Sequence, residues 1–140
     1  MGTAEIIEEI FANMLAALTE GSQITPLIAS RGDPLPADFA VITATNPAAP
    51  DSPPGLTWEV SLSINIPIER RGEAELLAAT FLSLTLQAIA DFATARFSGI
   101  LPGHFYSWSP ALSETDLTEG DRLILTATGS LTCARFTLGE

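Results

Sequence analysis

Apolar and polar residues alternate without a break over residues 56–68. A period of two residues is typical of a β-strand with one buried face and one face in water. We therefore expect a long strand here, spanning roughly 43 Å at ~3.3 Å per residue. Its apolar positions are Leu56, Trp58, Val60, Leu62, Ile64, Ile66 and Ile68.

A helical repeat follows directly after a charged turn, Glu69-Arg70-Arg71-Gly72. Apolar residues recur at every third or fourth position from Ala74 to Phe92, which is the spacing of an amphipathic helix. We expect one helix from about Glu73 to Thr94, roughly 33 Å long. A helix of that length covers most of the apolar face of the strand before it.

Two further segments show clear patterns. Residues 3–18 carry an apolar stripe at helical spacing that ends before Gly21, with Glu5, Glu8 and Glu9 near the helix N-terminus, where the helix dipole favours acids. Residues 122–136 alternate again, and Gly129 predicts a bend or bulge within that strand.

The remaining segments are shorter. Residues 39–45 are apolar on both faces, which predicts an inner strand. Residues 104–109 predict a short aromatic strand with Phe105 and Trp108 inward. Proline and glycine make 22–38 a loop with at most one short turn, and the acids of 113–121 predict a solvated turn.

Together these elements predict one α+β domain over residues 1–140. Its antiparallel sheet has about four strands, with two α-helices packed against it. A proline-rich loop at 46–55 interrupts the pattern, and a binding arm and a long hairpin connection are equally compatible with it. Its prolines are Pro47, Pro50, Pro53 and Pro54.

The charge balance excludes several classes of partner. Seventeen acids stand against six basic residues, all arginine, for a net charge of −11. Such a chain repels nucleic acid and anionic lipid, so we expect no sequence-specific nucleic-acid binding and no membrane docking. The sequence contains no run of eighteen apolar residues, so it predicts no transmembrane segment.

Candidate chemistry is sparse. The sequence has no nucleophile elbow, phosphate-binding loop, dinucleotide fingerprint or paired cysteines. His104 is the single histidine, and no Cys, Asp or Glu lies near it at the spacing of metal ligands. Cys133 is expected to pack in the interior as a small apolar residue. We expect no enzyme activity, no cofactor and no metal.

The two long strands carry a prediction about assembly. Both exceed the usual five or six residues, whereas a compact domain of this size has a radius of gyration of only ~14 Å. We expect their ends to project past the core, where a second copy completes them. Pro67, which lacks an N–H, predicts that the 56–68 strand is peripheral near its end.

The order of these elements resembles the small tail-completion or tail-terminator proteins of long-tailed bacteriophages. The resemblance covers most of the chain and rests on element order and pattern. It is carried by the N-terminal amphipathic helix, Thr25-Pro-Leu-Ile-Ala-Ser-Arg-Gly, Phe39-Ala-Val-Ile-Thr-Ala, Trp58-Glu-Val-Ser-Leu-Ser-Ile-Asn-Ile, Gly72-Glu-Ala-Glu and the closing strand from Leu123 to Phe136.

This resemblance implies a structural virion protein that assembles in the host cytoplasm. Copies of such a protein form a homo-oligomeric ring, usually a hexamer, in the tail or neck. The ring caps the tail tube and joins it to the head–tail connector, and DNA passes through the lumen. An acidic lumen would let DNA slide without sticking.

The family has no catalytic residues to transfer, so the interface residues are chosen on physical grounds. We expect contacts at Arg70 and Arg71, at outward Glu59, and along the arm that contains Pro47, Pro50, Pro53 and Pro54. Two alternatives stay open. One is another virion component, such as a head-closure, neck or decoration protein. The other is a small-molecule binding module in which His104, Tyr106 and Trp108 line a pocket.

Overall fold

The computed structural model describes residues 3–18, 24–29, 32, 37–46, 57–97, 99, 100 and 102–134. Within these ranges, the side chains of Thr3, Pro102 and residues 111–119 are not described. The predicted arm prolines Pro47, Pro50, Pro53 and Pro54 lie outside the described residues, as does the predicted end of the last strand at Phe136.

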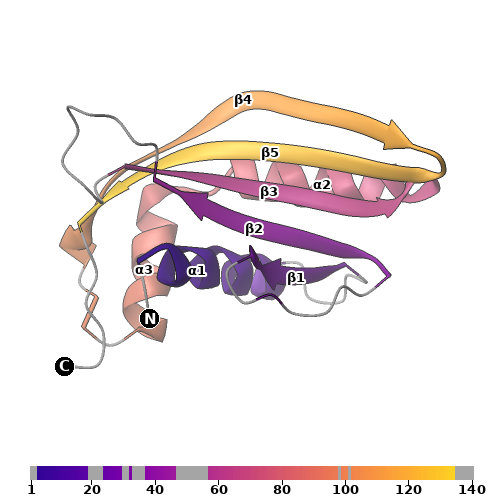
Figure 1. The fold of residues 1–140 in the computed structure, drawn as a ribbon. Helices are drawn as coiled ribbons and strands as arrows, with labels where there is room; N and C mark the ends of the chain where they lie inside the picture. Colours follow the sequence, from indigo (N-terminus) through magenta and orange to yellow (C-terminus); the bar gives the residue numbers. More distant parts are fainter. Residues whose placement is uncertain are drawn as a thin grey trace.

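Five strands form one sheet in the order β1-β2-β3-β5-β4 (Figure 1). All neighbours are antiparallel except β1 and β2, which run parallel. The strands are β1 Thr25–Ile28, β2 Phe39–Thr45, β3 Thr57–Pro67, β4 Phe105–Glu119 and β5 Arg122–Cys133. The predicted α+β class is therefore confirmed, and the predicted inner position of residues 39–45 is confirmed as β2.

The alternation predicted for the two long strands is confirmed by burial. In β3 every second side chain from Trp58 to Ile66 is buried, and in β5 the same holds from Leu123 to Cys133. In β2, Ala40, Ile42 and Ala44 face the same side. One face of the sheet is thus continuously apolar, and this face forms the core.

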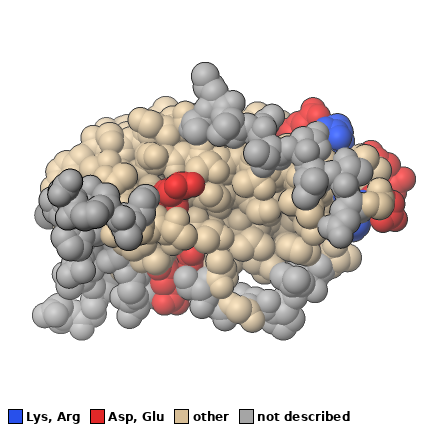
Figure 2. Space-filling model, turned by 45° about the horizontal axis from the view of Figure 1, so that its top comes forward, with Lys and Arg blue, Asp and Glu red and all other residues tan. Residues whose placement is uncertain are grey.

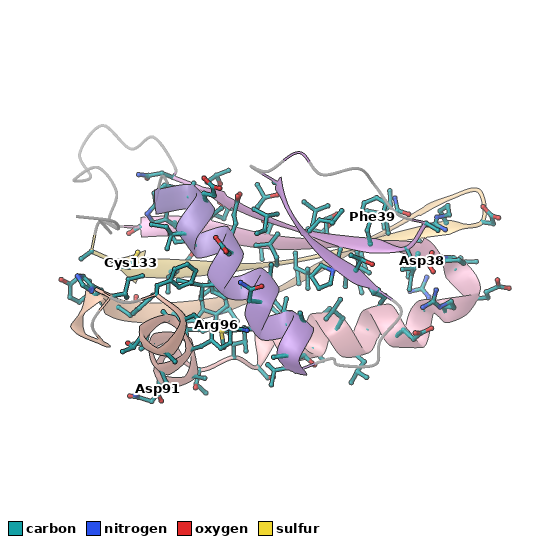
Figure 3. The ribbon with its side chains drawn as sticks, turned by 90° about the horizontal axis from the view of Figure 1, so that it is seen from below. Asp38, Phe39, Asp91, Arg96 and Cys133 are labelled. Atoms are coloured by element: carbon teal, nitrogen blue, oxygen red, sulfur yellow. The ribbon has the colours of Figure 1, made fainter. Side chains whose placement is uncertain are left out.

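The described helices all lie on that apolar side of the sheet, and none of them lies on the other side (Figure 1). The three α-helices are α1 Thr3–Leu18, α2 Arg71–Leu82 and α3 Leu86–Arg96, with short 3-10 turns η2 Ile68–Arg70 and η3 Pro102–His104. Helix α1 contacts β1 and β2, α2 contacts β3 and β5, and α3 contacts β4. Seen from the helix side in Figure 3, α1 runs diagonally across the sheet.

The prediction of a single helix from Glu73 to Thr94 is wrong. The chain leaves the helix after Leu82 and restarts at Leu86, and the two helical segments meet at 89°. Thr85 caps the second helix, because its hydroxyl oxygen accepts a hydrogen bond from the Ala88 N–H at 3.1 Å. The bend directs α3 toward the end of the sheet that a straight helix would not cover.

The predicted count of about four strands and two helices is therefore also wrong. Besides the extra helix, residues 25–28 form strand β1 within the segment predicted as a loop. The predicted acidic turn at 113–121 is mostly strand, since β4 continues to Glu119 and the turn is made at Gly120 and Asp121. Gly120 has a positive φ of 62°, a conformation that glycine adopts without strain.

The long strands do not project past the core. Trp58 and Leu131 at one end and Ile66 and Leu123 at the other are all buried, because three helices together cover the full length of the sheet. Strand β3 also lies at the centre of the sheet, with β2 and β5 on its two sides. Pro67 nevertheless lies at the margin of the sheet, since β2 begins at Phe39, opposite Asn65, and of the two neighbouring strands only β5 pairs with Pro67.

Three aromatic side chains join the helices to the sheet. Phe11 of α1, Phe81 of α2 and Trp108 of β4 lie with ring centroids 5.1 to 5.8 Å apart. The Trp108 ring also lies directly over Gly129, where a Cβ would come within 2.8 Å of Cζ2. Gly129 was predicted to mark a bend or bulge. Strand β5 pairs with β3 without interruption there, and the register shift at this point begins opposite Gly129 but places the extra residues in β4, between Pro110 and Glu114.

Replacing Gly129 with alanine should therefore destabilise the protein, by about 1–3 kcal/mol, because the added methyl group overpacks the Trp108 site. Gly72→Ala in α2 is the matched control, since a Cβ there meets nothing within 4 Å. Chemical unfolding followed by circular dichroism measures both. Equal stability of the two variants would contradict the role assigned to the Trp108–Gly129 contact.

Candidate functional site

The side of the sheet opposite the three helices carries no described helix. We call it the outer face and define it by the alternate side chains of β2, β3 and β5. Strand pairing places these side chains in rows across the sheet. They are Phe39, Val41, Thr43, Thr45, Thr57, Glu59, Ser61, Ser63, Asn65, Pro67, Arg122, Ile124, Thr126, Thr128, Ser130 and Thr132.

Hydroxyl groups dominate the middle of the outer face and pair with one another. The Ser61 and Thr128 hydroxyls lie 3.2 Å apart across β3 and β5, and the Thr126 hydroxyl donates to the Ser63 oxygen at 3.4 Å. Such cross-strand pairs stabilise a sheet. These hydroxyl groups already have hydrogen-bond partners within the sheet. Covering this surface with another molecule therefore breaks fewer hydrogen bonds to water.

Charge is nearly absent from the outer face. Among its sixteen defining residues only Glu59 and Arg122 are charged, in a chain whose net charge is −11. In Figure 2 much of the described surface on this side is uncharged, arginine side chains are visible only toward one end, and acidic side chains lie both there and nearer the middle of the molecule. The outer face is therefore the part of the sheet that another acidic molecule can approach with the least repulsion.

An ion-pair cluster closes one end of this face. Arg122 donates to the Asn65 side chain at 3.0 Å and to the Ala37 carbonyl at 2.7 Å. Asp38 lies between Arg122, whose Nη1 is 3.4 Å from its Oδ1, and Arg70, with which it forms a direct ion pair (Figure 3). The cluster ties the start of β2 to the end of β3 and the start of β5.

The predicted interface residue Arg70 belongs to this cluster. Its guanidinium also binds both carboxylate oxygens of Glu73, at 2.5 and 2.9 Å. Hydrogen bonding to Glu73 raises the pKa of Arg70, and the same hydrogen bond lowers the pKa of Glu73 below 4.5. The structure thus gives Arg70 partners within its own chain.

The other predicted interface residues are more accessible. Arg71 is 40% exposed and lies 3.9 Å from Glu75 in α2. Glu59 is exposed on the outer face, opposite Thr45 and Ser130 on the neighbouring strands. The structure therefore places Glu59 far along the strand from the Arg70–Arg71 turn and does not bring the predicted residues together.

The two edges of the sheet differ. Strand β1 is only four residues long and pairs as far as Ile42 of β2. Beyond it the Ala44 N–H donates to a carboxylate oxygen of Glu8 at 2.8 Å, and Glu8 is 1% exposed. Glu8 was predicted only as an acid that complements the helix dipole. No sequence signal identifies its role on the β2 edge, because the contact depends on how α1 crosses the sheet.

The opposite edge is β4, on whose outer side the described part of the chain places no strand. Pro110 and two register shifts interrupt it, at Phe105 to Ser107 and at Pro110 to Glu114. A proline and bulges are features with which natural edge strands resist pairing with other chains. Neither edge is therefore a long regular template for a new strand.

The predicted ligand residues do not gather around a common site. Trp108 packs into the core against Phe11 and Phe81, whereas Tyr106 is 59% exposed and His104 is partly buried. Cys133 is fully buried, as predicted, and its desolvation raises the pKa of the thiol to about 12. At that pKa the thiol stays protonated at neutral pH.

The described residues contain neither a cluster of metal ligands nor a single helix that could span a membrane. No three His, Cys, Asp or Glu side chains in those ranges lie close enough to hold a metal ion. No single described helix is long and apolar enough to cross a membrane. The bent pair Ile68–Leu82 and Leu86–Arg96 reaches the required length and composition only when its two segments are taken together.

Comparison with known proteins supports the fold. No protein-family model matches the sequence, and no curated protein matches it. One solved protein structure is similar over 96% of this chain and 94% of its own, with a TM-score of 0.52 and 12% sequence identity. Its name describes no function, and at this identity the similarity shows a shared fold alone.

The Glu8 contact can be tested by substitution. Glu8→Ala leaves the Ala44 N–H without this acceptor, so we expect the free energy of unfolding to fall by about 1–3 kcal/mol. Glu8→Gln keeps an acceptor oxygen and should lose less. Glu5→Ala, on the same helix, is the control. If Glu8→Ala and Glu5→Ala unfold at the same denaturant concentration, Glu8 does not hold this edge.

The Arg70–Glu73 contact predicts a pH dependence. The pKa of Glu73 is lowered in the folded protein, so its contribution is complete above pH 4.5 and is lost as the pH falls through the folded pKa. Glu73→Gln should therefore be less stable than the unmodified protein at neutral pH, and the difference should vanish in strong acid. Unfolding curves over a pH series measure this. A difference that grows toward acid would refute the assignment.

Proposed function

We propose that this chain is a structural protein of a bacteriophage virion, of the tail-terminator class. In this proposal its copies form a ring that caps the tail tube and joins it to the head–tail connector. The order of the sequence elements supports the class, as described above. The observation that carries the assembly role is the outer face of β2, β3 and β5, on which no described helix packs and only Glu59 and Arg122 are charged.

The charge distribution explains why this face favours assembly. Copies with a net charge of −11 repel one another over most approaches. The central parts of protein interfaces are depleted of charged residues, and the outer face has that composition. Its partly paired hydroxyls and the apolar side chains of Phe39, Val41 and Ile124 lose little when water is removed.

The acids on the helix side fit the same role. Glu69, Glu73, Glu75 and Asp91 are exposed on the helical layer, where Glu73 and Glu75 form ion pairs with Arg70 and Arg71. The two other carboxylates, Glu69 and Asp91, repel DNA phosphates. In a ring with acids toward the channel, DNA passes without being bound. The proposal accordingly includes no sequence-specific binding of nucleic acid.

The proposal predicts a defined assembly. Six chains of 14.8 kDa give a ring of about 89 kDa, which native mass spectrometry and negative-stain electron microscopy detect. Added salt should strengthen the assembly because it screens the repulsion between acidic copies. A species that stays at 14.8 kDa at every protein and salt concentration, with no ring in the images, would contradict the proposal.

The location of the protein in purified virions separates this role from its alternative. Antibody labelling at the junction of tail and head supports the terminator role. Labelling over the capsid surface would instead identify a decoration protein, which is also a structural virion component. Both roles need an assembly surface. The mass measurement therefore tests whether the copies assemble, and the labelling tests where in the virion they lie.

A further inference from the structure

The two ends of the sheet differ in the charges that they leave unpaired. Among the arginines of the described ranges, Arg70, Arg71 and Arg122 each pair with a carboxylate of their own chain. Arg96 is exposed in the last turn of α3, and no carboxylate of the described residues pairs with it. Its guanidinium carbon lies 5.5 Å from the centre of the Phe92 ring instead.

The contact with Phe92 prepares Arg96 to bind a carboxylate. The two residues are four positions apart and therefore share one face of α3, and Phe92 packs partly buried against the core. A guanidinium held over an aromatic ring keeps its N–H donors for a carboxylate, and less side-chain freedom remains to be lost on binding. Aromatic residues and arginine are also enriched in protein interfaces. We call Phe92 and Arg96 the basic patch.

The opposite end of the sheet exposes an apolar side chain beside two acids. Ile68 is 38% exposed, and its N–H donates to the Asp121 carbonyl at 2.9 Å, which places η2 next to the turn between β4 and β5. Glu69 and Asp121 are both exposed, and neither forms an ion pair with the described part of the chain. We call Ile68, Glu69 and Asp121 the acidic patch.

The arginines near the acidic patch do not neutralise it. Arg70, Arg71 and Arg122 are already bound to carboxylates, namely Asp38, Glu73 and Glu75. Glu69 and Asp121 are the acids that remain at this end when those pairs are formed. The acidic patch therefore carries negative charge toward an approaching molecule.

The two patches cannot meet within one copy. Asp121 directly precedes β5, whereas α3 contacts η3, the turn before β4, and β4 begins opposite Cys133 at the end of β5. The 12 residues of β5 separate these ends by ~37 Å at ~3.4 Å per residue. In Figure 3, Arg96 lies toward one end of the molecule and Asp38, next to the acidic patch, lies toward the other.

We infer that the basic patch of one copy binds the acidic patch of the next, with Arg96 against Asp121 and Phe92 against Ile68. The inference rests on the proposed ring and names a contact between its neighbours. Because the patches are unlike and lie at opposite ends, each bound copy keeps one patch for a further copy. Repeated with a rotation that closes, such a contact builds a ring.

The charge of the chain favours a second copy as the partner. Copies with a net charge of −11 repel one another on most approaches, and an unpaired cation against an unpaired acid selects one orientation in which they attract. Asp91, the other charged residue of α3, accepts a hydrogen bond from Gln87 at 2.8 Å and lies about 140° around the helix from Arg96. Figure 3 shows Asp91 and Arg96 on different sides of α3, so Asp91 does not oppose the contact.

This contact is compatible with the expected effect of salt. Salt screens the repulsion between distant charges of two copies strongly, whereas a charge pair in direct and partly desolvated contact is screened much less. Added salt can therefore strengthen the assembly although one ion pair lies within it.

Charge reversal distinguishes this contact from a general effect of net charge. Arg96→Glu should raise the dissociation constant between copies by at least about tenfold. Asp121→Arg should raise it by a similar factor, although it makes the chain less acidic and would strengthen an assembly limited by overall repulsion alone. Glu75→Arg makes the same change in net charge on α2 and should raise the constant by no more than about twofold. Sedimentation velocity measures these constants, and circular dichroism confirms that each variant is folded.

A combined variant tests whether the two residues meet. Arg96→Glu together with Asp121→Arg restores opposite charges across the contact, so the constant should return to within about threefold of the unmodified protein. If the unmodified protein assembles, and either the single reversals assemble equally well or the combined variant does not recover, this contact is wrong and the ring role stands. If the unmodified protein never assembles, the contact and the ring role fall together.

Discussion

The fold depends on burying a single apolar face that is ~37 Å long. Strict alternation in β3 and β5 turns every large apolar side chain of those strands toward the same side. No one helix of ordinary length covers that surface, so the chain uses three. The right-angled bend between α2 and α3, together with the diagonal crossing of α1, distributes helical cover over the whole sheet.

The junction of these helices explains several residues that look unrelated in the sequence. Phe11, Phe81 and Trp108 come from α1, α2 and β4 and meet in one cluster. Gly129 lies beneath that cluster because the Trp108 ring leaves no room for a Cβ. Buried Glu8 follows from the same arrangement, since α1 passes over the part of β2 that the short β1 does not reach.

Much of the fold was predictable from the period of the apolar residues. The helix at 3–18 and the strands at 39–45, 57–67 and 122–133 follow from it because long periodic segments have one face to bury. The break at 83–85 was missed since Leu84 continues the apolar pattern through the bend. Strand β1 and the second half of β4 were missed because proline and acidic residues resemble turns when their pairing partners are unknown.

The candidate surface was less predictable than the fold. Glu59 was identified as an outward residue because alternation alone fixes which side of β3 it occupies. The expectation of projecting strand ends was wrong, because it compared strand length with the size of a compact domain and did not foresee that three helices share the cover of the apolar face. The proposed assembly surface is the opposite face, and its low charge becomes visible only when β2, β3 and β5 are placed side by side.

Hydroxyl-radical footprinting measures most directly whether the outer face is an assembly surface. The protein would be oxidised when dilute and again when concentrated, and the modification of each side chain compared. We expect Phe39 and Ile124 on the outer face to become protected at high concentration, while Leu76 and Leu18, which are exposed on α2 and α1, keep their reactivity. Protection of Leu76 and Leu18 with Phe39 and Ile124 unchanged would contradict this account.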